Sequence, residues 1–263
     1  MNASKERREM MEPLRLRPAY DHIVGTTAFF RNRSLVSTVI GELKKLEASK
    51  LHILFHSSSI GAEPYSFIIS ALNSGLSSKF ELNCFATDLS QAFLDFAATG
   101  TYPVEVLKAM SSAESKFFSR RQSQCVIKKL VRDKVSFLQA SDIRSFSPER
   151  HFDVVFLLNA LVYVTEAEQR QVFERISTYN THLLIVTGFH QETIRSDLES
   201  NGYEPVLTNI EDIHNNWTDR MRPEPILKAD LPSNIYADWS LQPFAKESDW
   251  QYKFCAVFRK RNS

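Results

Sequence analysis

The sequence predicts an α/β fold, built on a mostly parallel sheet of about seven strands with helices on both faces. Short apolar runs alternate with segments of helical periodicity along the 263 residues, an order that is typical of parallel sheets. The last two strand-like segments have no crossover helix between them, which indicates that one strand near the end of the sheet is antiparallel. A chain of this length is large enough for one such domain.

Helices are predicted where apolar residues recur at every third or fourth position. In the first of them, Leu35, Val39 and Leu43 share one face. Gly100 is the expected end of one helix, and Thr165, which precedes a glutamate-rich turn, is the expected N-cap of another. The expected helices are residues 35–46, 67–72, 91–98, 103–110, 113–118, 165–177 and 191–200.

Strands are predicted where short apolar runs end in polar or turn-forming residues. The runs 51–56 and 152–158 are the most apolar, as expected of strands that are buried on both faces. Residues 220–249 hold four of the ten prolines and follow no regular pattern, so a lid, a small subdomain or a surface excursion is expected there. The expected strands are residues 51–56, 80–87, 126–129, 134–138, 152–158, 182–187, 203–209 and 252–259.

Composition excludes several classes of protein. The net charge of +1 gives no electrostatic reason to expect nucleic acid or an anionic membrane as a partner. No apolar run reaches the ~20 residues that span a bilayer, and residues 1–11 lack the apolar core of a secretion signal, so a cytoplasmic protein is expected. Cys84 and Cys255 lie in strand-like runs and are expected to be buried thiols. No C-x-x-C or H-E-x-x-H motif is present, so no metal site is predicted.

The turn His56-Ser-Ser-Ser-Ile-Gly-Ala-Glu-Pro-Tyr-Ser66 separates an expected strand from an expected helix. Small residues in such a turn allow a ligand to approach the backbone, and the helix N-terminus offers unpaired N–H groups. The turn does not have the G-x-G-x-x-G pattern, so a dinucleotide fits poorly. The carboxylate of Glu63 instead favours a ligand that carries a cation or an amine.

Further patterns follow in a fixed order: T-A-F-F-R at 27–31, S-I-G-A-E-P-Y-S at 59–66, A-T-D-L at 86–89, T-G-T-Y at 99–102, F-D-V-V-F at 152–156 and N-A-L-V-Y at 159–163. From about Thr26 to Ser177, the chain resembles the S-adenosylmethionine-dependent methyltransferases of the chemotaxis-receptor type, the CheR family. The resemblance implies a Rossmann-like class I methyltransferase fold. It also implies S-adenosylmethionine (SAM) as cofactor, S-adenosylhomocysteine (SAH) as product, and no metal.

The resemblance also implies an organisation and a set of site residues. Residues 1–48 would be a helical segment that contributes to the active site, shorter than the helical domain of the receptor enzymes. Residues 49–263 would form the methyltransferase domain, with an irregular insertion at about 218–249. Arg31 and Tyr163 would be catalytic, and the acceptor would lie near Tyr163, Trp217 and Arg220. The cofactor-binding residues would be Thr27, Arg31, Ser57, Gly61, Glu63, Asp88, Leu89, Ser141, Asp142, Leu158 and Asn159.

Within that set, Glu63 would contact the amino group of the methionine moiety and Asp88 the ribose hydroxyls, while Ser141 and Asp142 would lie near the adenine. Structural roles compete with these assignments. Asp88 or Ser90 would serve as a helix cap, Glu63 would favour a helix dipole, and Asp142 would cap a turn. Trp217 and Arg220 would equally suit an amphipathic surface turn, and His56 is expected to be structural.

The sequence departs from the family at Leu158, where an arginine commonly stands before the asparagine. An arginine there would pair with an acceptor carboxylate, so its replacement disfavours receptor glutamate as the substrate. The first expectation is therefore O-methylation of a small, acidic metabolite. A CheR-like protein glutamate carboxyl methyltransferase and a non-catalytic SAM-binding sensor are the alternatives. N-methylation stays open, and the oligomeric state is not predicted.

Overall fold

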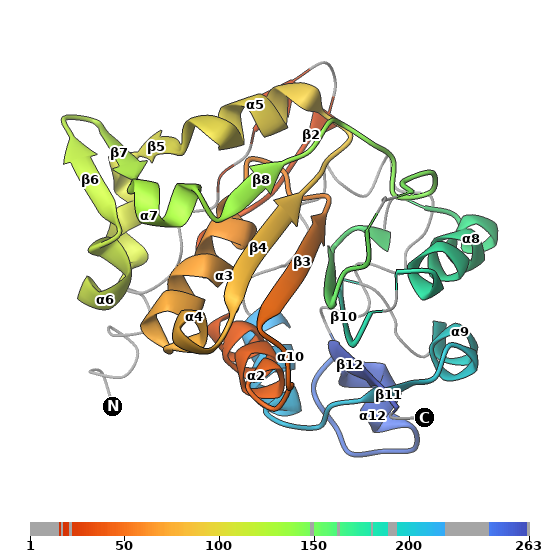
Figure 1. Ribbon diagram of the computed structural model, residues 1–263. Coiled ribbons are helices and arrows are strands. Elements are labelled where there is room, and N and C mark those ends of the chain that lie inside the picture. The colour runs from red at the N-terminus through yellow and green to blue at the C-terminus, as the bar shows by residue number, and fades with distance from the viewer. Residues whose placement is uncertain are drawn as a thin grey trace. The chain divides into compact units, whose positions relative to one another are not determined.

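The computed structural model describes residues 16, 18–20, 23–147, 150–161, 164–179, 181–188, 194–218 and 242–261. Its main element is a seven-stranded sheet in the order β11-β12-β10-β9-β3-β4-β8 (Figure 1). β12 is antiparallel to both neighbours, whereas β9 is parallel to β3 and to β10, and β4 is parallel to β8. The expected α/β fold with one antiparallel strand is confirmed. In sheet order, the strands are Tyr203–Pro205, Val257–Lys260, Leu183–Thr187, Val154–Leu158, Lys50–His56, Glu81–Ala86 and Val135–Phe137.

The chain consists of two compact units. The first unit comprises residues 1–31, 48–50 and 58–140, and the second comprises 32–47, 51–57 and 141–263.

In the first unit, α3 and α4 run along β4, and β8 lies beside β4 (Figure 1). Tyr65, Phe67 and Ile68 of α3 are almost completely buried, so this helix forms much of the unit's core. A two-stranded sheet (β1-β2) and a three-stranded antiparallel sheet (β5-β7-β6) complete it. The helices are α3 (Ala62–Asn73), α4 (Leu76–Lys79), α5 (Gln91–Thr99), the 3₁₀ helix η1 (Val104–Ala109), α6 (Ser112–Ser115) and α7 (Lys129–Arg132). The small strands are β1 (Ala19–Tyr20), β2 (Ile23–Val24), β5 (Thr101–Pro103), β6 (Phe118–Arg121) and β7 (Gln124–Ile127).

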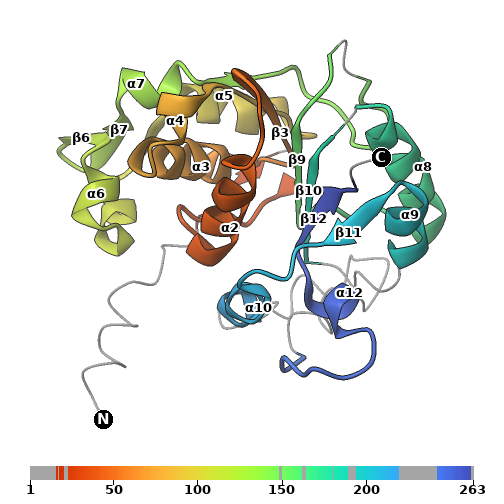
Figure 2. The same cartoon turned by 60° about the horizontal axis from the view of Figure 1, so that its bottom comes forward.

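In the second unit, α10 lies beside α2, and α8 lies beside α9 (Figure 2). The Asn32 side chain caps α2 by accepting the Leu35 N–H at 3.0 Å, and it also donates to the Ile213 carbonyl of α10 at 2.9 Å. Thr165 and Glu168 form a capping box at the start of α8, as expected for Thr165. The helices are α2 (Arg33–Leu43), α8 (Glu166–Ser177), α9 (Arg195–Ser200), α10 (Ile210–Thr218) and α12 (Trp250–Phe254).

Several sequence-based boundaries were wrong. The strand expected at 252–259 begins instead with α12, and only its last residues join β12. A short apolar run fits both periodicities, and Tyr252 and Phe254 are buried here on a helix. Residues 126–129 contribute to β7 of the small antiparallel sheet, not to the main sheet. The expected strand 203–209 ends at Pro205, and α10 follows where no helix was expected.

Two shorter elements also differ. Residues 104–109 form a 3₁₀ helix, and the helix expected at 113–118 stops early because Phe118 opens β6. All three cysteines are buried thiols, as expected for Cys84 and Cys255. Across the described residues, no helix combines the length and the apolar character that a membrane crossing requires.

Candidate functional site

The turn after β3 is shaped by a glycine that no other residue can replace without strain. Gly61 has φ +81°, a left-handed conformation, and it is the N-cap of α3. A Cβ at this position would lie 2.9 Å from both the Ala97 Cβ and the Phe137 Cζ atoms. The close approach of α5 and β8 to this turn therefore depends on the missing side chain.

Two serines of the same turn also have left-handed backbones, Ser57 with φ 53° and Ser59 with φ 48°. Such conformations are uncommon for residues other than glycine and gather at ligand-binding turns. The turn is held by a hydrogen bond from Gly61 N–H to the Ser58 carbonyl at 2.9 Å. It is held as well by the Asp88 carboxylate, which accepts the Ser59 N–H at 2.8 Å.

Three predicted site residues meet in the first unit. An ion pair joins Arg31 Nη1 to Glu63 Oε1 at 3.2 Å, and the Thr27 hydroxyl donates to Glu63 Oε2. The side chains of Arg31 and Glu63 are only 6% and 13% exposed. Phe30 N–H donates to the Ser66 hydroxyl at 2.9 Å, which fastens the T-A-F-F-R segment to α3. A segment far from the turn in sequence is thus brought against the start of the helix.

The electrostatics of Glu63 are set by two opposing effects. Burial raises the pKa of this carboxyl, while the Arg31 guanidinium and the Thr27 hydroxyl lower it. A buried carboxylate with one cationic partner retains acceptor capacity for a second donor. A ligand ammonium group is the kind of donor that suits it.

Asp88 follows β4, and both of its carboxylate oxygens accept backbone N–H groups. Ser59 donates to Oδ2 at 2.8 Å, and Ser90 donates to Oδ1 at 3.1 Å. The N-cap of α5 is Ser90, whose side chain accepts the Phe93 N–H at 3.3 Å, so the carboxylate is not the helix cap. Burial raises the pKa of Asp88. The neighbouring Leu89 side chain is 54% exposed, unusual for a leucine and suited to covering an apolar ligand face.

In the second unit, polar residues stand where neighbouring strands end: His56, which is buried, ends β3, Asn159, which is half-buried, follows β9, and Thr187, which is buried, ends β10. Asn159 has φ 55° and donates its N–H to the Thr187 carbonyl at 3.1 Å. Among the described residues, nothing hydrogen-bonds to His56 Nε2 or Asn159 Oδ1. Leu158, the residue before Asn159, is half-buried. Buried polar atoms without partners mark a place where a ligand or water completes the structure.

Asp142 performs the structural role that the sequence left open. It closes a turn by accepting the Phe146 N–H at its carbonyl at 2.8 Å, and its carboxylate accepts the Arg144 N–H at 2.8 Å. The Arg144 guanidinium pairs with the same carboxylate, which lowers the pKa of Asp142. Ser141 precedes it and is half-buried.

The structure does not describe the side chains of the three residues predicted to lie near the acceptor. Tyr163 and Arg220 lie outside the described residues, and Trp217 lies in α10 without a described side chain. Sequence reasoning did not single out Ser58 and Ser59 as site residues, although both lie in the turn that it identified.

The first unit fits a sulfonium nucleoside. Ser58 Oγ and Ser59 Oγ are buried without a hydrogen-bond partner among the described residues. They lie in a turn whose close packing depends on Gly61, next to the Asp88 carboxylate, which follows β4 and suits sugar hydroxyls. Glu63 supplies the carboxylate that an amino group requires. The serine hydroxyls, the two carboxylates and the small-residue turn therefore match the polar groups of such a ligand.

The affinity for SAH is expected to depend on pH through Glu63. Because burial raises the pKa of this carboxyl above 4.5, its ionised form increases as the pH rises through the raised value. The ligand ammonium binds the ionised form, so affinity should rise with pH across this window and fall below it. Calorimetric titration with SAH at several pH values measures this. In Glu63→Gln the affinity for SAH should be lower and independent of pH. Glu105 is exposed, so Glu105→Gln should keep the wild-type dependence of affinity on pH.

His56 is expected to make the fold sensitive to acid. Burial lowers the pKa of its imidazole from 6.5 to about 3, with Asp142 opposing the shift. Between these values the unfolded chain binds a proton that the folded chain does not, so stability falls as the pH is lowered. At ~1.4 kcal/mol per pH unit, acidification across two units within this window costs about 3 kcal/mol.

Urea unfolding at about pH 6.5 and pH 4.5 measures this loss. His56→Gln cannot be protonated and should show a shallower pH dependence than wild type. Equal dependence in both proteins would show that other groups account for it.

The sheet order, the strained turn after β3 and the acidic residue after β4 together define the class of a Rossmann-like methyltransferase domain. The family described as "CheR methyltransferase, SAM binding domain" matches residues 25–201, well over half of the chain. The chain belongs to the CheR methyltransferase family.

Curated relatives agree with this assignment. A chemotaxis protein methyltransferase of Listeria innocua is 27% identical over 59% of this chain and 60% of its own length. Chemotaxis protein methyltransferase 2 of Pseudomonas aeruginosa is 27% identical over 57% of this chain and 56% of its own length. A probable chemotaxis protein methyltransferase of Rhizobium etli is 28% identical over 70% of this chain and 71% of its own length. The similarity to the first two thus spans less than two thirds of those proteins.

Proposed function

We propose that this protein is a SAM-dependent methyltransferase that methylates a carboxylate, and that the carboxylate belongs to a glutamate side chain of a chemotaxis protein. The names of the relatives support this acceptor over the small acidic metabolite that the sequence favoured. The bound cofactor supplies an activated methyl group. The observation that carries the proposal is the buried group of Arg31, Glu63 and Thr27, next to a turn with unpartnered polar atoms.

The protein's residues divide the work of binding. Glu63 holds the amino group of the cofactor, and Arg31 positions Glu63 while compensating its charge. Asp88 holds the ribose hydroxyls and at the same time orders the turn through Ser59. Because Thr27 and Arg31 contact Glu63, residues 1–48 contribute to the active site in this proposal. Orientation of the reacting atoms, which is worth about 7–11 kcal/mol in favourable cases, is then the main contribution to rate.

A carboxylate acceptor is favoured because it needs no general base. A hydroxyl or an amine must lose a proton, which requires a group whose pKa lies near the operating pH. His56, at the end of β3, has a pKa of about 3 and is therefore too weak a base. The His214 ring is fully buried, with Nε2 2.7 Å from the Gln242 carbonyl. An acceptor that is already ionised avoids the requirement.

Leu158 favours the second candidate, a small acidic metabolite. An apolar side chain at the end of β9 cannot neutralise the carboxylate of a receptor glutamate. A cation for that carboxylate would have to come from another residue. Leu158→Arg separates the two. If glutamate is the acceptor, the added guanidinium should raise kcat/KM for a glutamate-containing protein. If a metabolite is the acceptor, it should lower turnover of that metabolite.

The experiment that tests the proposal is an assay of released SAH after calorimetry has measured cofactor binding. Acceptors would be chemotaxis-protein fragments, the same fragments with glutamine in place of glutamate, and a pool of acidic metabolites. Turnover that disappears with the glutamine fragments supports the proposal. Turnover only in the metabolite pool supports the second candidate, and SAH binding without turnover of any acceptor supports a sensor.

A further inference from the structure

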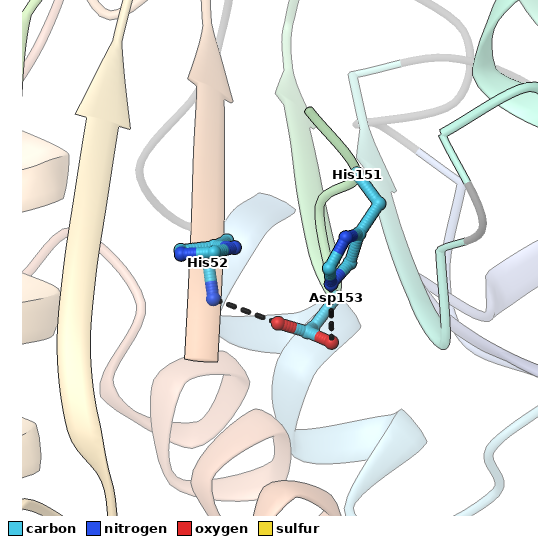
Figure 3. A group of neighbouring side chains, drawn as sticks. All are labelled: His52, His151 and Asp153. Atoms are coloured by element: carbon cyan, nitrogen blue, oxygen red, sulfur yellow. Dashed lines mark hydrogen bonds and ion pairs between the residues drawn. The ribbon is translucent and has the colours of Figure 1, made fainter. Parts of the chain in front are cut away.

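Two histidines and an aspartate meet at the amino ends of two strands in the second unit (Figure 3). His52 lies near the start of β3, and Asp153 immediately precedes β9. The parallel register that pairs Ile53 with Val154 places these two residues side by side. His151 lies two residues before Asp153, on the segment that leads into β9. The polar side chains at the carboxyl ends of these strands lie at the opposite edge of the sheet, so this cluster is separate from the candidate active site.

The three side chains converge on one point. Asp153 Oδ2 accepts the backbone N–H of His52 at 2.7 Å, and Asp153 Oδ1 lies 3.9 Å from His151 Nε2. The two imidazole rings are 5.4 Å apart between centroids. One ligand atom from each residue lies within 4.8 Å of the other two. Figure 3 shows both interactions ending on the Asp153 carboxylate.

The carboxylate at the centre is both rigid and poorly compensated. The Asp153 side chain is 12% exposed, and its backbone is held by a bond from its N–H to the His52 carbonyl at 2.9 Å. In the described part of the chain, no lysine or arginine forms an ion pair with Asp153. A largely buried carboxylate flanked by two imidazoles is the environment that a divalent cation stabilises.

We propose that His52, His151 and Asp153 bind a divalent transition metal ion of the zinc type. Two imidazoles and one carboxylate are preferred ligands of such ions, and the coordination would be completed by water. Ligand atoms around zinc lie about 3.3 Å apart when metal–ligand bonds are near 2.0–2.1 Å. Rotation of His151, whose side chain is 56% exposed, shortens its 3.9 Å distance to Asp153 without moving either strand. The ion would fasten the segment before β9 to the start of β3.

The absence of a metal signature in the sequence does not conflict with this site. His52 is separated by about a hundred residues from the other two, and the sheet alone brings them together. Spacing motifs detect only ligands that are close in sequence. The proposal stands independently of the proposed function, because the cluster contains no residue of the candidate active site.

The test is titration of the full chain, freed of any histidine tag and chelator, with Zn²⁺ followed by calorimetry and metal analysis. The expected result is one equivalent bound in the micromolar range, with a rise in the melting temperature when Zn²⁺ is added. His151→Ala should weaken binding by at least about tenfold and remove the thermal shift. Because His151 is exposed, this variant should fold normally. Asp153→Asn retains an acceptor for the His52 N–H and should weaken binding comparably.

His182→Ala is the matched control. This exposed histidine donates its backbone N–H to the Asp153 carbonyl but is not part of the cluster, so its replacement should leave Zn²⁺ affinity unchanged. Failure of the wild-type chain to bind stoichiometric Zn²⁺ would overturn the proposal. Binding that survives both His151→Ala and Asp153→Asn would overturn it equally.

Discussion

Replacing Asp88 with alanine is expected to weaken SAH binding by at least about 100-fold, the loss of two charge-assisted hydrogen bonds at ~1.5–3 kcal/mol each. The carboxylate is buried after β4, where sugar hydroxyls of a nucleoside would meet it. It also holds the Ser59 N–H, so its loss should loosen the turn that surrounds the ligand. Calorimetry with SAH measures the affinity, and circular dichroism reports whether the variant is folded.

Asp88→Asn refines this result. The amide retains an acceptor for the Ser59 N–H but lacks the negative charge, so it should preserve the fold and still bind SAH more weakly than wild type. Asp95→Ala is the matched control, since Asp95 is exposed on α5 and hydrogen-bonds only to Gln91 in the interactions described. Folded Asp88→Asn protein with wild-type affinity would contradict the assigned role of Asp88.

Gly61→Ala is expected to destabilise the protein by about 2–5 kcal/mol. A left-handed backbone costs a residue with a Cβ ~1–2 kcal/mol, and overpacking adds ~1–3 kcal/mol. The new methyl group would lie 2.9 Å from Ala97 of α5 and 2.9 Å from Phe137, the last residue of β8. A loss of this size is a large fraction of the stability of a typical domain. Urea unfolding measures it as a lower midpoint with an unchanged slope.

Gly75 provides the matched control for steric crowding. It has φ +75° but no atom within 4 Å of a Cβ position. Gly75→Ala should therefore lower the free energy of unfolding only by the cost of the backbone conformation, ~1–2 kcal/mol. Equal destabilisation of the two variants would show that the contacts with Ala97 and Phe137 contribute nothing. In that case the close packing of the turn would not explain the glycine.

The turn after β3 was predictable because its sequence pattern is local. Small residues between an apolar run and a helical pattern predicted both the turn and α3, and Glu63 was proposed as a ligand residue because it places a carboxylate in that turn. The mostly parallel character of the sheet followed from the alternation of strand-like and helical patterns. From the sequence, Asp88 could be either a ligand residue or the N-cap of the next helix, because Asp and Ser are both good caps. The structure shows that Ser90 is the cap.

Other features were beyond local reasoning because they depend on contacts between distant segments. The ion pair of Arg31 with Glu63 joins residues 32 positions apart, and the sequence offers no sign of it beyond two aromatic neighbours. Tyr252 and Phe254 fit a strand as well as a helix; in the structure they lie on α12, where Tyr252 stacks on Phe258 and Phe254 contacts the His214 ring. Asp142 was equally suited to a ligand and to a turn, and the proximity of Arg144 favours the turn.

A crystal structure of the protein with SAH tests the central claim most directly. We predict that the amino group of SAH lies within hydrogen-bond distance of Glu63, and that its ribose hydroxyls lie on Asp88. The ligand would cover the turn that contains Ser58 and Ser59. A well-ordered SAH molecule that contacts neither carboxylate would contradict the account.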